Sequence, residues 1–289
     1  MKPPKPRRTS ILKLFFIAAT LLLVVAPNVN AEDAPGYRLP RFRRVPGQIR
    51  IAPLPAGTAL RLLADEDFPP YSFRTRSGAA AGLAVELAMA ACAKLKIACE
   101  VGLLPLPGLL PALANGQGDV IVAGPRIDAQ ALVQTEVTRP WFRSLGRFAA
   151  QSGSPIGASD TRTLAGKRIG AVKGTSHAAW LATYYSDSKL IGFDSEEQAQ
   201  DALRTGNVEA LFGDDLRQIF WVSGAASRGC CKLLGGAYSD FDSFSRSYAF
   251  LMAAGRGDLR EAFDQALDQM QEDGTTEKIF NIYVPLNPW

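Results

Sequence analysis

The 289-residue sequence has little of what metal sites and common catalytic sites require. It contains one histidine, His177, and four cysteines, with no C-x-x-C pair among them. It also lacks the G-x-S-x-G, P-loop and G-x-G-x-x-G motifs. We therefore expect no metal, no cofactor and no catalytic residue. The acidic pairs at 65–66 and 214–215 are of a type that can serve in acid–base chemistry, but short solvated acidic pairs are common.

A long hydrophobic run is also missing. The apolar stretch from Leu14 to Ala26, broken only by Thr20, is shorter than the roughly 20 residues that span a bilayer. A basic segment precedes it, and the small-residue signal Val29-Asn30-Ala31 follows it. This order predicts a cleavable signal peptide at residues 1–31 and disfavours a permanent anchor.

The exported part has almost no net charge. The whole chain has a formal net charge of +4, and residues 1–31 carry five basic residues and no acidic one, so cleavage leaves −1. This balance gives no support to nucleic-acid binding.

Export makes disulfides possible, although cysteine is scarce. Cys92, Cys99, Cys230 and Cys231 allow three complete pairings. A bridge between Cys92 and Cys99 is plausible, pairing of the adjacent Cys230 and Cys231 is disfavoured, and buried free thiols are an alternative.

Alternating strands and helices follow a Pro- and Arg-rich linker at 32–57. The expected strands are 62–64, 97–101, 119–123, 168–172, 190–193 and 208–212, with possible crossover strands at 146–151 and 248–253. The expected helices are 82–95, 109–114, one opening at 174–176, one from Ser195 to Arg204, and one that begins at Asp258 in capping-box spacing with Glu261. This alternation predicts an α/β fold with mainly parallel sheets.

One segment of the chain recurs. ALANGQGDVIVAG at 112–124 returns as ALRTGNVEALFGD at 202–214, with the Ala-Leu pair, the glycine and the acid before the strand in phase. One such pair can arise by chance, but two similar α/β lobes would also produce it. We favour two lobes.

Polar and aromatic residues collect where the predicted strands end. The candidate ligand-binding residues are Asp65, Phe68, Phe73, Arg126, Thr175, Ser176 and Asp214. An arginine can grip a carboxylate, a helix start can hold an anion, and aromatic faces clamp apolar or cationic groups. Because ligands bind outside the carboxyl ends of strands in open α/β sheets, we expect these residues to share one cleft.

Several segments together resemble a known family over residues 60 to 285. DEDFPPYSF, LLPALANGQGDVIVAG, LAGKRIGAVKGTS, ALRTGNVEALFGDD and EDGTTEKIFNIY occur in the order found in family-3 solute-binding proteins of amino-acid ABC transporters. The resemblance implies two α/β lobes joined by two crossover strands, at 58–147 plus 252–289 and at 148–251. It also implies a periplasmic monomer that delivers a small polar ligand to an ABC permease.

The resemblance assigns roles to individual positions. Asp65 and Phe68 match the first-loop acid and aromatic, Thr175 and Ser176 lie where the ligand carboxylate is approached, and Asp214 matches the acid that receives the α-ammonium group. The family's carboxylate-clamping arginine is replaced by Ala131. Either Arg126 takes over that role or the ligand is not an amino acid.

Two other functions are compatible with the same scaffold. One is an exported lyase that resembles cyclohexadienyl dehydratase, with Glu66 or Asp214 as the acid. The other is a binding module for a sensor or a periplasmic oxidation system.

Overall fold

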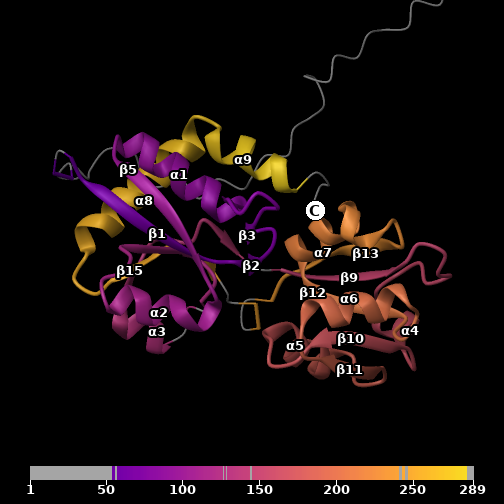
Figure 1. The fold of residues 1–289 in the computed structure, drawn as a ribbon. Helices are drawn as coiled ribbons and strands as arrows, with labels where there is room; N and C mark the ends of the chain where they lie inside the picture. Colours follow the sequence, from indigo (N-terminus) through magenta and orange to yellow (C-terminus); the bar gives the residue numbers. More distant parts are fainter. Residues whose placement is uncertain are drawn as a thin grey trace, which may run out of the picture. The chain divides into compact units, whose positions relative to one another are not determined.

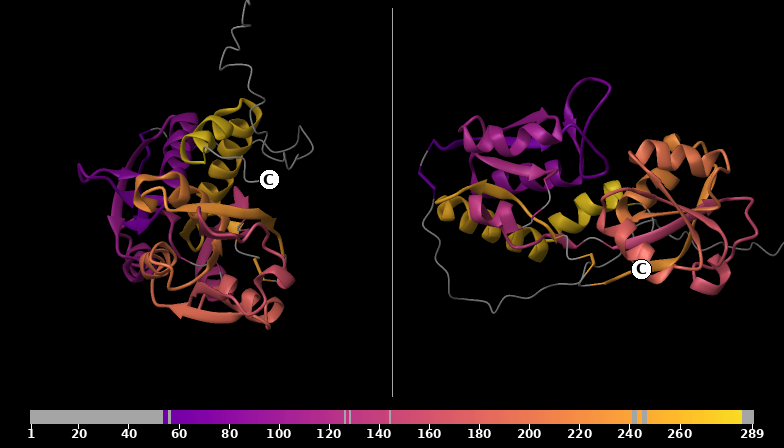
Figure 2. Two further views of the ribbon diagram at one scale, coloured as in Figure 1. Left: turned by 90° about the vertical axis from the view of Figure 1, so that its right-hand side faces the viewer. Right: turned by 90° about the horizontal axis from the view of Figure 1, so that it is seen from below.

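Two five-stranded sheets organise the described part of the chain (Figure 1 and Figure 2). The computed structural model describes residues 54–284 apart from 56, 126, 128, 144, 241, 242, 245 and 246. The expected signal peptide and nearly all of the expected linker lie outside the described residues. Within these residues, no helix is both long and apolar enough to cross a bilayer. We call the parts around the first and second sheets the first and second halves.

The first sheet has the strand order β5-β1-β6-β15-β7. β1 is parallel to β5 and β6, and β15 is antiparallel to β6 and β7. Its strands are β1 (Ala59–Asp65), β5 (Ala98–Leu104), β6 (Val120–Ala123), β7 (Thr135–Val137) and β15 (Leu251–Ala253). The helices of this half are α1 (Leu83–Leu95), α2 (Leu106–Ala114), α3 (Ala129–Gln134), α8 (Gly257–Glu272) and α9 (Thr275–Tyr283).

Helices cover both faces of the first sheet (Figure 1). Leu62 and Val120 pack on the face covered by α1, α8 and α9, whereas Leu63 and Ile121 pack on the face of α2 and α3. Successive side chains of a strand point to opposite faces, so a sheet covered on both sides needs apolar residues at every position. The continuous apolar run of β6 meets this requirement, and each buried side chain of this size contributes about 1.5–3 kcal/mol.

The second sheet has the strand order β11-β10-β12-β9-β13. Its strands are β9 (Gly146–Gln151), β10 (Arg168–Val172), β11 (Lys189–Phe193), β12 (Ala210–Asp214) and β13 (Cys231–Tyr238). Its helices are α4 (Thr161–Leu164), α5 (Ser176–Tyr184), α6 (Glu196–Arg204) and α7 (Asp215–Ser223), followed by the short turn η2 (Ala225–Ser227). Phe212 of β12 packs with Trp180 of α5 on one face, and Leu211 packs with Leu203 of α6 on the other.

Two short strands mark the places where the chain passes between the sheets. β8 (Phe142–Arg143) pairs antiparallel with β14 (Ser247–Tyr248). The expected crossover strands at 146–151 and 248–253 are therefore displaced, because β9 belongs to the second sheet and β15 to the first. A three-stranded sheet of β2 (Asp67–Phe68), β3 (Ser72–Arg74) and β4 (Ala80–Ala81) follows β1.

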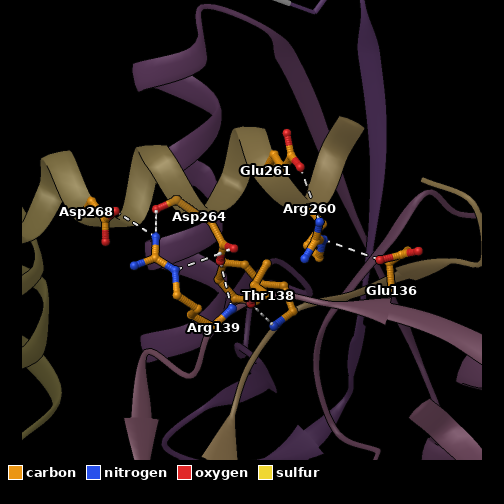
Figure 3. A network of polar contacts seen from close by, with 8 residues as sticks. Glu136, Thr138, Arg139, Arg260, Glu261, Asp264 and Asp268 are labelled. Atoms are coloured by element: carbon orange, nitrogen blue, oxygen red, sulfur yellow. Dashed lines mark hydrogen bonds and ion pairs between the residues drawn. The ribbon is translucent and has the colours of Figure 1, made fainter. Parts of the chain in front are cut away.

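Ion pairs fasten the segment after β7 to α8 (Figure 3). The Arg139 backbone N–H donates to Asp264 at 2.7 Å, and the Arg139 guanidinium contacts Asp264 at 3.6 Å and Asp268 at 2.7 Å. Arg260 of α8 reaches Glu136 of β7 at 3.3 Å. Burial raises the pKa of the Asp264 carboxyl, and the bonds and charge from Arg139 oppose that shift. The segment that leaves the first half is thus held against α8.

Most expected elements are present, with small shifts at their ends. Ser195 caps α6 by accepting the Gln198 N–H at 3.2 Å. The expected capping box at Asp258 is wrong, because α8 follows Arg256 without a side-chain cap and Asp258 instead pairs with Arg256 at 2.9 Å. The sequence patterns do not predict α7 or α9.

All four cysteines form disulfides. Cys92 and Cys99 are joined with their Cα atoms 6.3 Å apart, which links the end of α1 to β5. Cys230 and Cys231 are also joined, so the expectation against adjacent pairing is wrong. In a regular strand adjacent side chains point to opposite faces. Cys230, however, lies in the turn before β13 and its C=O accepts the Ser152 N–H at 2.7 Å, so the turn places both sulfurs on one side.

Candidate ligand-binding site

A cavity of about 260 Å³ lies at the carboxyl ends of β10 and β12. The second half contributes these strand ends and the starts of α5, α6 and α7, and Phe68 of β2 and Tyr248 of β14 complete the wall. Strand ends of this kind are where open α/β sheets bind ligands. Pockets for drug-sized ligands have about 300–1,000 Å³, so the cavity suits a small metabolite.

Asp214 is the most extensively bonded acid of the cavity. It is buried and caps α7: its Oδ1 accepts the Tyr71 hydroxyl at 2.8 Å and the Arg217 backbone N–H at 3.2 Å, and its Oδ2 accepts the Tyr248 hydroxyl at 3.0 Å. The two tyrosine rings stack with their centroids 4.1 Å apart. Burial, and then the charge of Asp214, raise the pKa of Tyr71 well above its ordinary value. Tyr71 therefore stays protonated and donates.

An aromatic side chain and a cation meet in the wall of the cavity. Phe68 stacks on Tyr71 at 5.0 Å, and the Arg217 guanidinium carbon lies 5.0 Å from the centroid of the Phe68 ring. That distance is within the range of cation–π attraction. Glu196, at the start of α6, has its Oε2 3.7 Å from Arg217 Nε. Burial raises the pKa of the Glu196 carboxyl; the charge of Arg217 opposes this shift and that of Asp214 adds to it.

The start of α5 brings Thr175, but not Ser176, to this cavity. The Thr175 hydroxyl caps the helix by accepting the Ala178 N–H at 3.1 Å and donates to the Val172 C=O at 2.7 Å. Thr175 lines the cavity. Because the first turn of a helix leaves backbone N–H groups without partners in the helix, the start of α5 suits an anionic group of a ligand. Ser176 lines a separate hollow of about 650 Å³ along α5, which Thr175 also borders.

Asp65 lies behind the cavity wall at the end of β1. Its Oδ1 accepts the Asp67 N–H at 3.1 Å, and burial raises the pKa of the Asp65 carboxyl. Gly124 ends the neighbouring strand β6 at φ 127°, and a Cβ on Gly124 would meet a Leu109 methyl at 2.7 Å and Asp65 Cβ at 3.1 Å. A glycine is therefore required beside Asp65.

The remaining predicted positions do not join the cavity. Phe73 packs in the apolar core, with its ring 6.0 Å from Phe220 of α7 and 6.5 Å from Tyr283 of α9. Arg126 lies outside the described residues. Ala131, at the position where the family resemblance expects an arginine, is buried in the core on the α2 face.

Sequence reasoning misses most residues of the site. Those that make the polar and aromatic contacts described above are Tyr71, Glu196, Arg217 and Tyr248. Tyr71 lies inside the same aromatic motif as Phe68, so the motif itself is a signal for it. Arg217 follows Asp214 by three residues, the spacing of a helix cap and its first turn. Recognising α7 would have placed it. Tyr248 has no comparable local signal.

His177, the one histidine of the sequence, lines the cavity from the start of α5. It is buried, its Nε2 lies 3.1 Å from the Leu145 C=O, and its ring stacks on Phe244 at 4.9 Å. Across the described residues, no three His, Cys, Asp or Glu side chains gather as metal ligands would.

A buried ion pair anchors α7 behind the cavity. Arg147 Nε lies 2.5 Å from Asp215 Oδ1, and both side chains are almost inaccessible to solvent. The Asp215 N–H donates to the Leu145 C=O at 2.9 Å. Burial raises the pKa of Asp215 to about 7; Arg147 opposes this shift and the neighbouring Asp214 adds to it.

Comparisons with known proteins agree with this arrangement. The chain is 24% identical over 226 residues to the putative ABC transporter arginine-binding protein 2 of Escherichia coli K12, covering 78% of this chain and 90% of that protein. It is 25% identical over 252 residues to the histidine-binding periplasmic protein of the same organism, with 84% and 89% covered. The solved structure of an ancestral arginine-binding protein bound to arginine has a TM-score of 0.60 at 26% identity, with 78% and 97% covered.

The family itself is shown by a match over most of the chain. Residues 60–285 match the model for bacterial extracellular solute-binding proteins, family 3. The structural relatives of this chain have the two-lobe fold of periplasmic binding proteins, in agreement with the two sheets and with the predicted fold class. The chain therefore belongs to the bacterial extracellular solute-binding proteins of family 3.

Proposed function

We propose that this protein is a periplasmic solute-binding protein that captures a small polar metabolite, an amino acid or a related compound, for an ABC importer. The observation that carries the proposal is the cavity at the ends of β10 and β12, whose wall is completed by Phe68 and Tyr248. Two relatives of this chain are named for arginine binding and histidine binding, which supports an amino acid or a related compound as the ligand. An aromatic face, an acid and a helix start are the groups that a small zwitterion needs.

Among the predicted site residues, we propose that Phe68, Thr175 and Asp214 form the ligand-contacting surface. Asp65 supports the wall from behind, and Asp214 also holds the two tyrosine rings in place. Roles for Phe73, Arg126 and Ser176 in ligand binding stay predictions.

Isothermal titration calorimetry with a panel of L-amino acids, amines and small carboxylates tests the proposal. We expect one chemical group of the panel to bind. Replacing Asp214 by Ala should weaken that binding at least about tenfold, because it removes the acid of the proposed contact surface and the acceptor that holds the Tyr71 and Tyr248 hydroxyls in place. Asp160→Ala is a matched control, since Asp160 also caps a helix of the second half, through Arg162 and Thr163, away from the cavity. It should bind like the wild type.

Three outcomes would contradict parts of the proposal. Failure of the whole panel to bind would remove the assigned function. Equal losses in the Asp214 and Asp160 variants would move the ligand away from this cavity. Turnover of prephenate or arogenate by the purified protein would identify a lyase, whereas a binding protein leaves these compounds unchanged.

We also propose that residues 1–31 are removed on export and that the mature monomer delivers its ligand to an inner-membrane permease. Mass spectrometry of the periplasmic protein should then give an N-terminus at Glu32. Deletion of the gene should abolish uptake of the labelled ligand. Unchanged uptake would favour a sensor or a periplasmic oxidation system as the partner.

A further inference from the structure

Arg217 places a cation inside the cavity. It is the third residue of α7, and 17% of its side chain is exposed. Its guanidinium is held over the ring of Phe68, which comes from the first half of the chain. Among the described residues that line the cavity, Arg217 is the one arginine or lysine.

The donors of Arg217 are not saturated by the protein. A guanidinium has five N–H donors, and the buried Nε of Arg217 makes no hydrogen bond to any described residue. The carboxylate of Glu196 is 3.7 Å from this Nε, which is longer than a hydrogen bond. Burial raises the pKa of the Asp65 carboxyl, and the charge of Arg217 opposes this shift, so the two groups are close. Asp65 Oδ1, however, already accepts the Asp67 N–H. The guanidinium is therefore able to receive an anion.

Asp214, one of three acidic residues that line the cavity with Asp194 and Glu196, is in the opposite condition. A carboxylate has about four acceptor positions, and Asp214 already receives the hydroxyls of Tyr71 and Tyr248 and the Arg217 backbone N–H. An arriving ammonium group would compete with these donors for the carboxylate. A ligand carboxylate at Arg217 would compete with the Glu196 carboxylate, which lies beyond hydrogen-bond distance of Nε.

We propose that Arg217 binds the carboxylate of the ligand and determines specificity, so that the ligand class is small carboxylates for which an α-ammonium group contributes little. This inference rests on the proposed function and names its ligand class. Two parallel hydrogen bonds from the guanidinium fork fit a carboxylate, and the stacked Phe68 ring keeps the fork in one orientation.

Matched ligand sets on the wild-type protein test the inference without a variant. Each set has an amino acid, its amine without the carboxylate, and its acid without the α-amino group. Examples are L-arginine, agmatine and 5-guanidinopentanoate, or L-histidine, histamine and imidazole propionate. In the set that binds, we expect loss of the carboxylate to weaken the Kd about 100-fold, and loss of the amino group to weaken it less than about tenfold.

Variants then assign the effect to one residue. Arg217→Ala should make the amino acid and its amine bind equally, and Arg217→Lys should recover only part of the difference because it lacks the fork. Arg168→Ala is the control, since Arg168 is an exposed arginine of the second half that pairs with Glu209. Circular dichroism checks that each variant is folded.

The possible failures are distinguishable. If no panel member binds, both the proposed function and this inference are overturned. If the wild type binds the amine as well as the amino acid, or needs the amino group more than the carboxylate, the function stands and the inference is wrong. Loss of carboxylate discrimination in Arg126→Ala but not in Arg217→Ala would also overturn it.

Discussion

The two halves of the molecule are built on one plan. The repeated segments at 112–124 and 202–214 each give a helix end, a glycine with positive φ and a buried strand. β1 lies between β5 and β6 in the first sheet, as β10 lies between β11 and β12 in the second. An antiparallel strand pairs with β6 in the first sheet (β15) and with β12 in the second (β9). The same unit therefore occupies the same place in each half.

The repeated acid makes the same bonds in both halves. The Arg61 N–H donates to the Asp119 carboxylate at 2.8 Å, and the Asp119 N–H donates back to the Arg61 C=O at 2.8 Å. In the second half the Arg168 N–H donates to the Glu209 carboxylate at 2.9 Å, and the Glu209 N–H donates to the Arg168 C=O at 2.9 Å. The acid is thus kept in phase because it fastens the start of one parallel strand to the next.

The halves differ where the repeated strand ends. In the first half the strand ends at Gly124, which is closely packed against Asp65 and Leu109. In the second half it ends at Asp214, which caps α7 and faces the cavity. The shared unit accounts for the fold, and residues at the end of its second strand, β12, and just after it carry the candidate chemistry.

The largest expected effects come from matched core truncations. Leu62 and Ile169 each follow by one residue the arginine whose N–H donates to the repeated acid, and both are fully buried. We expect Leu62→Ala and Ile169→Ala each to lower the free energy of unfolding by about 2–5 kcal/mol. Urea denaturation measures this. If only one of the two variants were destabilised, the halves would not be equivalent in their cores.

A pH dependence should distinguish the second half. The Asp215 carboxyl has an ordinary pKa of 3.8 and a folded pKa of about 7. Between these values the folded protein keeps a proton that the unfolded chain has released. The free energy of unfolding therefore falls as pH rises through this range. The contribution is at most about 1.4 kcal/mol per pH unit.

Asp215→Asn should remove this contribution. Urea denaturation at pH 4.5, 5.5 and 6.5 should give a flatter profile for the variant than for the wild type. The control from the first half is Asp264→Asn, whose carboxyl pairs with the more exposed Arg139, and which should change the slope less. Parallel profiles for the wild type and Asp215→Asn would show that Asp215 titrates in its ordinary range.

The smallest expected effects come from the repeated acid. Asp119→Ala and Glu209→Ala each remove the acceptor of one strand N–H, and we expect each to cost about 1 kcal/mol. The side chains of Arg61 and Arg168 lose an ion pair as well, but both are about half exposed and such pairs contribute little. Costs that differ by more than twofold would argue against one plan for both halves.

The sequence is sufficient for the fold class because the relevant signals are local. Buried runs such as 119–123, the cap at Ser195 and the repeat each depend on neighbouring residues. The site is predicted in part for the same reason, since Phe68, Thr175 and Asp214 lie directly at strand ends or a helix start. The Asp258 cap fails because an aspartate near a helix start suits the first turn as well as the cap.

The sequence by itself therefore determined two α/β units, their repeat and the strand ends that line the candidate cavity. Only the tertiary structure decided that Tyr71 and Tyr248 bind Asp214, and that Arg217 lies over Phe68. Phe68 and Arg217 are 149 positions apart. The reason is physical: hydrogen bonds and ring contacts between distant segments depend on where the sheets and their connections bring the chain, which no local periodicity encodes.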